Sequence, residues 1–276
     1  MNELVKLLGR ERPLDSVNHA LHGYVRRLGA PVVGALHVTC ADESEWECID
    51  SFQRTFVDPL LPSLKFARKA PFRLSNLGAR YEPGAVAVAE HHFATPESGQ
   101  TFKVLLIKIN AHVATEGAGS RAVYGRMRRY DTESAACGAL HALLAGADRP
   151  YLSELRRTFA ADGLDRLALL HDEQRVAPAY RSLFVALVSA RLQTRRAAQD
   201  IENHTPASPT LYAIASCCTL NRPEEDSELL CGVHVADYRA AAPTAEYRGL
   251  GDDPTGYVVQ YDAGRLRVTD AELTRR

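Results

Sequence analysis

The chain has 276 residues, of which 46% are hydrophobic and 24% charged, and this composition excludes an intrinsically disordered protein. The formal net charge of −1 creates no long-range field that would attract nucleic acid or an anionic membrane. No stretch approaches the roughly 20 apolar residues of a membrane-spanning helix, and charged residues interrupt the N-terminal segment before an export signal develops. We therefore expect a cytoplasmic protein with no nucleic-acid partner and no membrane partner.

The first predicted elements are a helix and a buried strand. Residues 14–28 place apolar side chains at helical spacing, and the segment 29–31 ends the helix with glycine and proline. Residues 31–39 form a short apolar run rich in β-branched residues, which is typical of a strand buried on both faces. Cys40 follows at the carboxyl end of that strand, where ligands bind in open α/β sheets. The turn from Cys40 to Asp42 is therefore predicted to belong to a functional site.

The next part of the chain is predicted to be helical and then to form a hairpin. Residues 43–68 read mostly as helix with breaks at Pro59 and Pro62, and the basic run 65–73 that overlaps its end is interpreted as a solvated face. Residues 84–93 are then expected to pair as a strand with residues 102–110 across a turn at 95–99. Residues 102–110 are the most apolar predicted strand, and they lead directly to His112.

The second half begins with helices and ends with hairpins. Residues 131–203 read as helical, and 131–134 supply the caps and acidic side chains of a first turn. Hairpins are predicted for 211–219 with 228–236 and for 256–261 with 265–268. Strands on both sides of a helical middle predict an α/β fold with a mixed sheet flanked by helices. We expect a single domain over residues 1–276, with an N-terminal helix 14–28, a helical middle 131–203 and C-terminal hairpins 210–268.

Three predicted strand or helix ends hold a good metal ligand. Cys40 and His112 each follow a strand, and Cys137 lies in the first turns of a helix. Thiolate and imidazole ligands suit Zn²⁺, and three protein ligands leave a fourth position for a water whose pKa the metal lowers. The six cysteines are expected to be reduced in a cytoplasmic protein, where they either pack as small apolar groups or bind metal.

Spacing alone leaves other interpretations open, because the chain has no Cys-x-x-Cys pair. Cys137 suits a tight helix contact, and His112 suits a hydrogen-bonded core histidine. A further alternative is an all-imidazole site formed by His112, His37 and His234. All three are followed by valine in or next to a predicted strand. The adjacent pairs His91–His92 and Cys217–Cys218 are interpreted as structural. Neighbouring side chains of a strand point to opposite faces, so the two members of a pair cannot bind the same ion.

Several of these segments together resemble the β-class carbonic anhydrases, including the carboxysome-shell branch of that family. In that family a Cys-x-Asp-x-Arg turn follows a strand, a histidine ends a second strand, and a second cysteine opens a helix as Cys-Gly-Ala. The corresponding segments here are 38–42, 111–112 and 137–140. Residues 195–206 are similar to the family's late helix, and 256–266 are similar to its closing hairpin.

The resemblance implies a fold, a site and an activity. Cys40, His112 and Cys137 would bind Zn²⁺, and Asp42 would orient or gate the metal-bound water. The substrate would be CO₂ or bicarbonate, the activity that of a zinc lyase, and the protein a homo-oligomer whose site walls come from both subunits of a dimer.

The chain departs from the family pattern at three points. Ser44 stands where the family has its arginine, so that Arg54, Arg73 or Arg80 would have to hold Asp42 instead. Ser134 stands where the family's His-x-x-Cys spacing places histidine, and pairing His112 with Cys137 requires an insertion of more than twenty residues. Two further interpretations therefore stay open: a catalytically degenerate relative that acts as a structural or interaction protein, and another cytosolic zinc or thiol hydrolase that uses Cys40.

Overall fold

The fold is built on one large mixed sheet, and the computed structural model describes residues 1–30, 32–60, 70–92, 102–117, 119–129, 132–134 and 136–270. The strand order is β1-β9-β8-β4-β2-β3, with β10 also paired to β9 and β5 to β4. The strands are β1 (Glu11–Pro13), β2 (Val32–Cys40), β3 (Phe72–Asn76), β4 (Lys103–Glu116), β5 (Val123–Tyr124), β8 (Thr210–Asn221), β9 (Ser227–Tyr238) and β10 (Thr244–Gly249).

The strands β8, β4, β2 and β3 run parallel to one another, since β2 pairs in parallel with β3 and β4, and β4 pairs in parallel with β8. Strand β9 is antiparallel to β8 and is followed by β10 at its edge. Every residue of β2 is buried, as expected of a strand covered on both faces. The predicted mixed α/β sheet flanked by helices is thus confirmed.

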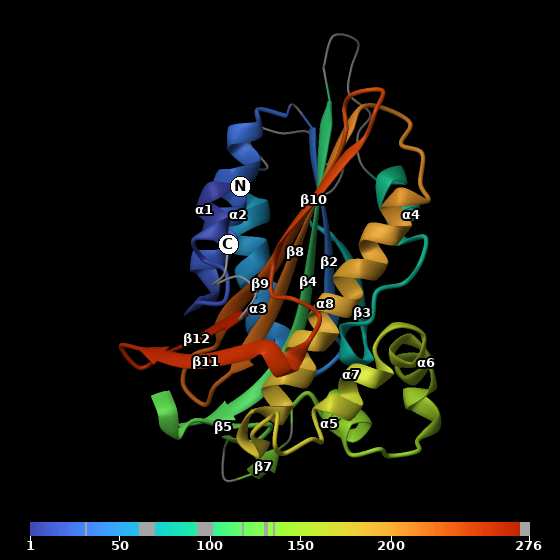
Figure 1. Ribbon diagram of the computed structural model, residues 1–276. Helices are drawn as coiled ribbons and strands as arrows, with labels where there is room; N and C mark the ends of the chain where they lie inside the picture. Colours follow the sequence, from blue (N-terminus) through green and yellow to red (C-terminus); the bar gives the residue numbers. More distant parts are fainter. Residues whose placement is uncertain are drawn as a thin grey trace.

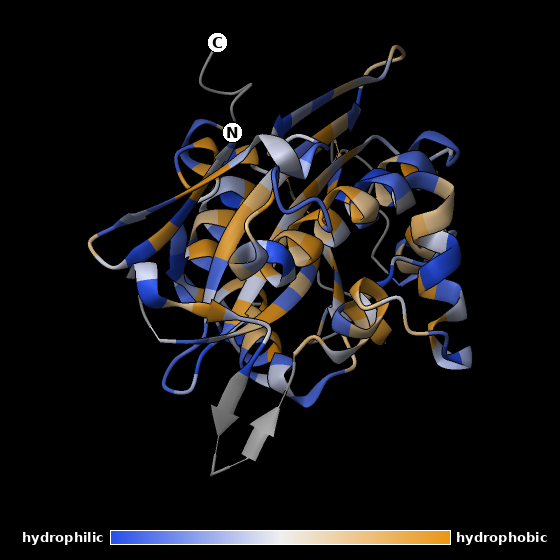
Figure 2. Cartoon of the chain, turned by 60° about the horizontal axis from the view of Figure 1, so that its bottom comes forward, coloured by the Kyte–Doolittle hydropathy of each residue, from blue (hydrophilic) through white to orange (hydrophobic). Residues whose placement is uncertain are grey.

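Helices cover both faces of this sheet (Figure 1). Helices α1–α3 lie on one face, and the long helix α8 lies with α4 on the other, as their separate apolar clusters show. The described helices are α1 (Asn2–Val5), α2 (Leu14–Leu28), α3 (Trp46–Phe52), α4 (Ala85–His91), α5 (Gly138–Leu144), α6 (Ser153–Asp162), α7 (Leu164–Leu169) and α8 (Arg181–Glu202). Figure 2 shows the apolar residues gathered on the central strands and α8, and more hydrophilic residues on the peripheral helices and loops. In the part of the chain that the structure describes, no helix is both long and apolar enough to cross a membrane.

Several predicted elements are confirmed with nearly the predicted bounds. Helix α2 spans residues 14–28, and β2 ends at Cys40. Strands β8 and β9 form the first C-terminal hairpin, and β11 (Tyr257–Asp262) pairs with β12 (Arg265–Asp270) as the second. The description of the whole chain as one domain stays a prediction.

Two predicted elements are wrong. Residues 84–93 do not form a hairpin strand, because Ala85–His91 is the helix α4 and β4 instead lies between the parallel strands β2 and β8. The expected turn at 95–99 lies outside the described residues. The helical middle begins at Gly138 and not at residue 131, because β7 (Thr132–Ser134) pairs with β6 (Met127–Arg129) in a small hairpin.

Four strands of the sheet were not predicted: β1 and β5 are only three and two residues long, and the other two are β3 and β10. Strand β3 includes Arg73, the last residue of the basic run 65–73. Residues 65–69 of that run lie outside the described part of the chain. Strand β10 follows the first C-terminal hairpin. Both are edge strands with alternating or largely exposed residues, so neither has the apolar run by which β2 and β4 are recognised.

Candidate metal centre

The two parallel strands β2 and β4 bring Cys40 and His112 to the same edge of the sheet. Cys40 is the last residue of β2, and His112 lies close to the carboxyl end of β4. Cys137 immediately precedes α5 and adopts an extended backbone there. The carboxyl ends of parallel strands form the ligand-binding edge of such sheets, so the fold itself brings together residues that are 97 positions apart in the sequence.

These three side chains form a compact, buried set. The Sγ atoms of Cys40 and Cys137 are 3.6 Å apart, and one ligand atom from each of the three residues lies within 4.8 Å of the others. Two sulfur ligands of one tetrahedral zinc ion lie about 3.8 Å apart, because each Zn–S bond is about 2.3 Å long. The sulfur pair therefore has the separation that a shared zinc ion requires. Among the described residues this is the one such group, and it includes neither His37 nor His234.

The orientation of the His112 ring favours a metal at Nε2. Its Nδ1 lies 2.8 Å from Asn221 Oδ1 and 3.3 Å from Ser44 Oγ, whereas its Nε2 is buried without a hydrogen-bond partner. A metal-binding histidine usually donates its other ring N–H to an oxygen, which fixes the ring and leaves the second nitrogen to the metal. The buried His112 Nε2, which lies near two thiols without a hydrogen-bond partner, is what we expect of a zinc ligand before the metal binds.

Backbone N–H groups surround both sulfur atoms. The Gly78 N–H donates to Cys40 Sγ at 3.3 Å. A hydrogen bond from Cys40 lowers the pKa of the Cys137 thiol despite its burial, with the help of the Leu140 and Ala139 N–H groups at the start of α5. The same hydrogen bond, together with burial, raises the pKa of Cys40 to about 12. In the metal-free protein Cys137 is thus the first thiol to ionise, and Cys40 donates to it.

Glu45 supplies a buried carboxyl group beside the histidine. It is fully buried, its Oε1 lies 3.8 Å from His112 Nδ1, and neither oxygen has a hydrogen-bond partner. Burial raises the pKa of Glu45 to about 8. Burial also opposes the charged imidazole, but Glu45 and Cys40 outweigh this effect and raise the pKa of His112 to about 10. A metal ion therefore has to displace a proton from this ring.

Among the described residues, Asp42 is held by Ser44 and pairs with no arginine. The Ser44 N–H and Oγ–H both donate to Asp42 Oδ1, at 3.0 and 2.8 Å. Of the arginines considered as substitutes, Arg54 pairs with acidic residues at positions 15 and 50, and Arg80 pairs with those at positions 82 and 154. The serine that replaces the expected arginine thus fixes the carboxylate itself and reaches His112 with the same hydroxyl.

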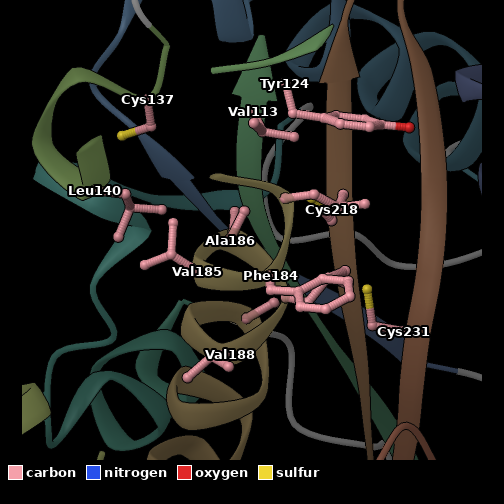
Figure 3. Packing of buried hydrophobic residues seen from close by; sticks show 14 of the residues in the cluster. Val113, Tyr124, Cys137, Leu140, Phe184, Val185, Ala186, Val188, Cys218 and Cys231 are labelled. Carbon is pink, nitrogen blue, oxygen red and sulfur yellow. The ribbon is translucent and has the colours of Figure 1, made fainter. Parts of the chain in front are cut away.

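The surroundings of the site include residues that the sequence does not reveal. Glu45, Gly78 and Asn221 have no motif in common with the cysteines, and Asn221 lies in the segment that connects the predicted hairpin strands 211–219 and 228–236. In Figure 3, Cys137 lies at the edge of an apolar cluster that also contains Leu140 and Val185. The cluster excludes water from one side of the site.

The class of fold is established by solved structures of low sequence identity. No family model matches the chain, and no curated protein is similar to it in sequence. Two solved structures share this α/β fold, in which helices flank a mixed, mainly parallel sheet.

The particular structures are those of LCIB proteins. The chain matches PtLCIB4, a homologue of the limiting CO₂-inducible protein LCIB, with a TM-score of 0.64 and 13% identity over 88% of this chain and 98% of that chain. It matches LCIB itself with a TM-score of 0.50 and 15% identity over 88% and 97% of the two chains. A tetrameric β-carbonic anhydrase from the filamentous ascomycete Sordaria macrospora matches more weakly, with a TM-score of 0.34 and 13% identity over 72% and 83%.

Proposed function

We propose that the chain is a zinc-dependent lyase of the carbonic anhydrase type, which interconverts CO₂ and bicarbonate. The observation that supports this most strongly is the buried set of Cys40, His112 and Cys137, whose ligand atoms lie within 4.8 Å of one another. The names of the similar structures point the same way, since LCIB is described as a limiting CO₂-inducible protein.

Each residue has a defined task in this proposal. Cys40, Cys137 and His112 Nε2 would hold the metal, and a zinc ion in such a site supplies a Lewis acid that activates water at neutral pH. Asp42 would orient the reacting water: Ser44 donates both of its hydrogen bonds to Oδ1, so Oδ2 is the oxygen that accepts from a molecule entering the site.

Two variants of buried cysteines test the metal site. Wild-type protein is expected to contain about one zinc per chain by elemental analysis, and Cys40→Ser is expected to lose it. Cys48→Ser is the matched control, because Cys48 is also free and buried but lies outside the ligand set. Equal zinc contents in all three proteins, or a metal-free wild type that remains folded, would contradict the site.

Stopped-flow CO₂ hydration tests the activity. The proposal expects a zinc-dependent rate that falls at least about tenfold in Asp42→Ala, because the orienting carboxylate is lost. A zinc-loaded wild type without hydration activity would favour the second candidate, a catalytically degenerate relative that keeps the metal for structure or interaction. The specific observation in favour of that candidate is Ser44, which holds Asp42 in place of the family's arginine.

The third interpretation, a hydrolase with Cys40 as nucleophile, has less support. Cys40 has its pKa raised to about 12, and a thiol is nucleophilic only as thiolate. We further propose a homo-oligomer, from the family resemblance, and a cytoplasmic location, from the sequence. Sedimentation equilibrium would reveal a mass above that of one chain, and fractionation of the source cells would place the protein.

A further inference from the structure

Asn221 lies at the end of β8, fully buried, in register with Ala114 of the neighbouring strand β4. Its carboxamide contacts three different parts of the chain. Nδ2 donates to the Ser44 carbonyl oxygen at 2.9 Å and to Asp226 Oδ2 at 3.0 Å, and Oδ1 lies 2.8 Å from His112 Nδ1.

The two partners of Nδ2 fix which way the carboxamide points. A backbone carbonyl and a carboxylate only accept hydrogen bonds, so the amide nitrogen has to face Ser44 and Asp226. The amide oxygen is then the atom that faces His112. An oxygen at this position accepts a hydrogen bond, so His112 Nδ1 has to carry a proton and donate it.

We infer that Asn221 is the positioning residue of the metal centre, which keeps the proton on His112 Nδ1 and thereby assigns Nε2 to the metal. This inference rests on the proposed function, because it gives the ring its task toward the metal. It goes beyond the family resemblance, which identifies three ligands and no residue behind them. Asp226 and Ser44 in turn hold Asn221.

A series of hydrogen bonds connects the turn between β8 and β9 to the proposed metal ligand His112. Asp226 is 1% exposed, and its Oδ1 accepts from the Arg222 N–H at 2.9 Å while Oδ2 accepts from Asn221. Ser44 contributes twice, since its carbonyl accepts from Asn221 and its hydroxyl lies 3.3 Å from His112 Nδ1. Partners of this kind behind a metal-bound histidine typically change metal affinity 10- to 100-fold.

The experiment compares two buried asparagines. Asn221→Leu is expected to weaken zinc binding by about 10- to 100-fold, measured by competition with a chromophoric chelator. Asn18→Leu is the matched control, because Asn18 is equally buried but bonds to Ser51 and Lys108 instead of a metal ligand. The control is expected to lose stability with a zinc affinity within about threefold of wild type. Equal zinc affinities of Asn221→Leu and wild type would overturn the inference.

A second variant covers the case in which Asn221→Leu does not fold. The exchange Asn221→Asp with Asp226→Asn keeps an oxygen opposite His112 Nδ1 and a donor–acceptor pair between positions 221 and 226, and it loses the hydrogen bond to the Ser44 carbonyl oxygen. Its zinc affinity is expected to stay within about threefold of wild type, and its cobalt(II) derivative to keep the wild-type sulfur-to-cobalt absorption bands. Loss of those bands in this folded exchange variant would count against the inference.

A measurement on metal-free protein separates this inference from the proposed function. The proton on His112 Nδ1 should give a slowly exchanging downfield NMR signal, which His112→Gln removes and thereby assigns. Asn221→Leu is expected to lose the signal, and Asn18→Leu to keep it. If wild type binds no zinc yet shows this pattern, the proposed function fails and Asn221 still positions the ring. If the signal persists in Asn221→Leu, the inference fails whatever the zinc content.

Discussion

Glu45 and His112 form a buried pair whose proton content differs between the folded and unfolded chain. The folded-state pKa of Glu45 is about 8 against an ordinary value of 4.5, and that of His112 is about 10 against 6.5. Both are raised, so without metal the folded protein holds more protons than the unfolded chain from about pH 4.5 to about pH 10. Stability from these groups is complete at low pH and is lost as the pH rises through this window.

We therefore predict that metal-free protein is less stable at about pH 9 than at about pH 6, by on the order of 5 kcal/mol. Urea unfolding at the two pH values measures the difference. Glu45→Gln should reduce it, because the variant removes one titrating group and the main cause of the raised His112 pKa. Glu47→Gln, at an exposed position of helix α3, which begins directly after Glu45, should leave it unchanged. A stability that rises with pH in this window would be inconsistent with the pair.

At the scale of elements, the short turn after β3 shapes one wall of the site. It contains Gly78, whose φ is +74° and whose N–H donates to Cys40 Sγ. A Cβ added at Gly78 would lie 2.9 Å from Leu155 Cδ2, in the helix α6. Two separate reasons, the left-handed backbone and the packed neighbour, thus require glycine at this position.

Gly78→Ala is predicted to destabilise the protein by about 2–4 kcal/mol, as the sum of backbone strain and overpacking. Gly84→Ala is the matched control: its φ is +85°, but a Cβ there meets nothing within 4 Å. The control should cost only about 1 kcal/mol. Thermal unfolding of both variants measures the difference, and equal losses would show that crowding against Leu155 is unimportant.

The element α4 shows where sequence patterns fail. Residues 85–89 alternate alanine and valine, and such a short apolar run fits a strand as well as a helix. The helical form is favoured by Asp200 of α8, whose carboxylate accepts from the N–H groups of Gly84 and Val86 at 2.9 and 3.3 Å. This contact joins residues more than a hundred positions apart, so no local pattern contains it.

The residues of the candidate site also fall into those that the sequence predicts and those that it does not. Cys40 and His112 could be predicted because each lies near the carboxyl end of a long apolar strand, where ligands bind in such sheets. Asn221 and Ser44 could not, because the hydrogen bond that joins them spans 177 positions of the chain. Patterns in the sequence thus locate the ligands, whereas the groups that orient them depend on the tertiary packing of the strands.

At the scale of the whole molecule, a buried polar network connects the helical layer with the sheet. Lys108 Nζ lies 2.9 Å from Glu228 Oε1 on β9 and donates to Asn18 Oδ1 on α2 at 2.7 Å. Both charged side chains have no solvent exposure. The Lys108 ammonium and the Glu228 carboxylate stabilise each other. Without its partner, either charge would lose its hydration in this interior and gain nothing in return.

Glu228→Gln is predicted to cost about 3–5 kcal/mol, because it leaves the Lys108 ammonium buried without its counter-charge. The double variant Lys108→Met with Glu228→Gln should recover at least half of this loss. Glu3→Gln serves as the control, because Glu3 pairs with Arg27 in the solvent, with side chains 62% and 52% exposed, and should cost less than about 1 kcal/mol. Chemical denaturation of the three variants is the measurement, and a Glu228→Gln loss no larger than the control's would exclude the assumed role of the pair.

In the proposed centre, three distant parts of the chain share one metal ion. X-ray absorption at the zinc edge of the purified protein tests this most directly, because it counts the ligand types around the metal. We predict two sulfur neighbours at about 2.3 Å and nitrogen or oxygen neighbours at about 2.0–2.1 Å, with loss of one sulfur or of the metal in Cys137→Ser. A zinc shell without sulfur, or a two-sulfur shell that persists in Cys137→Ser, would contradict it.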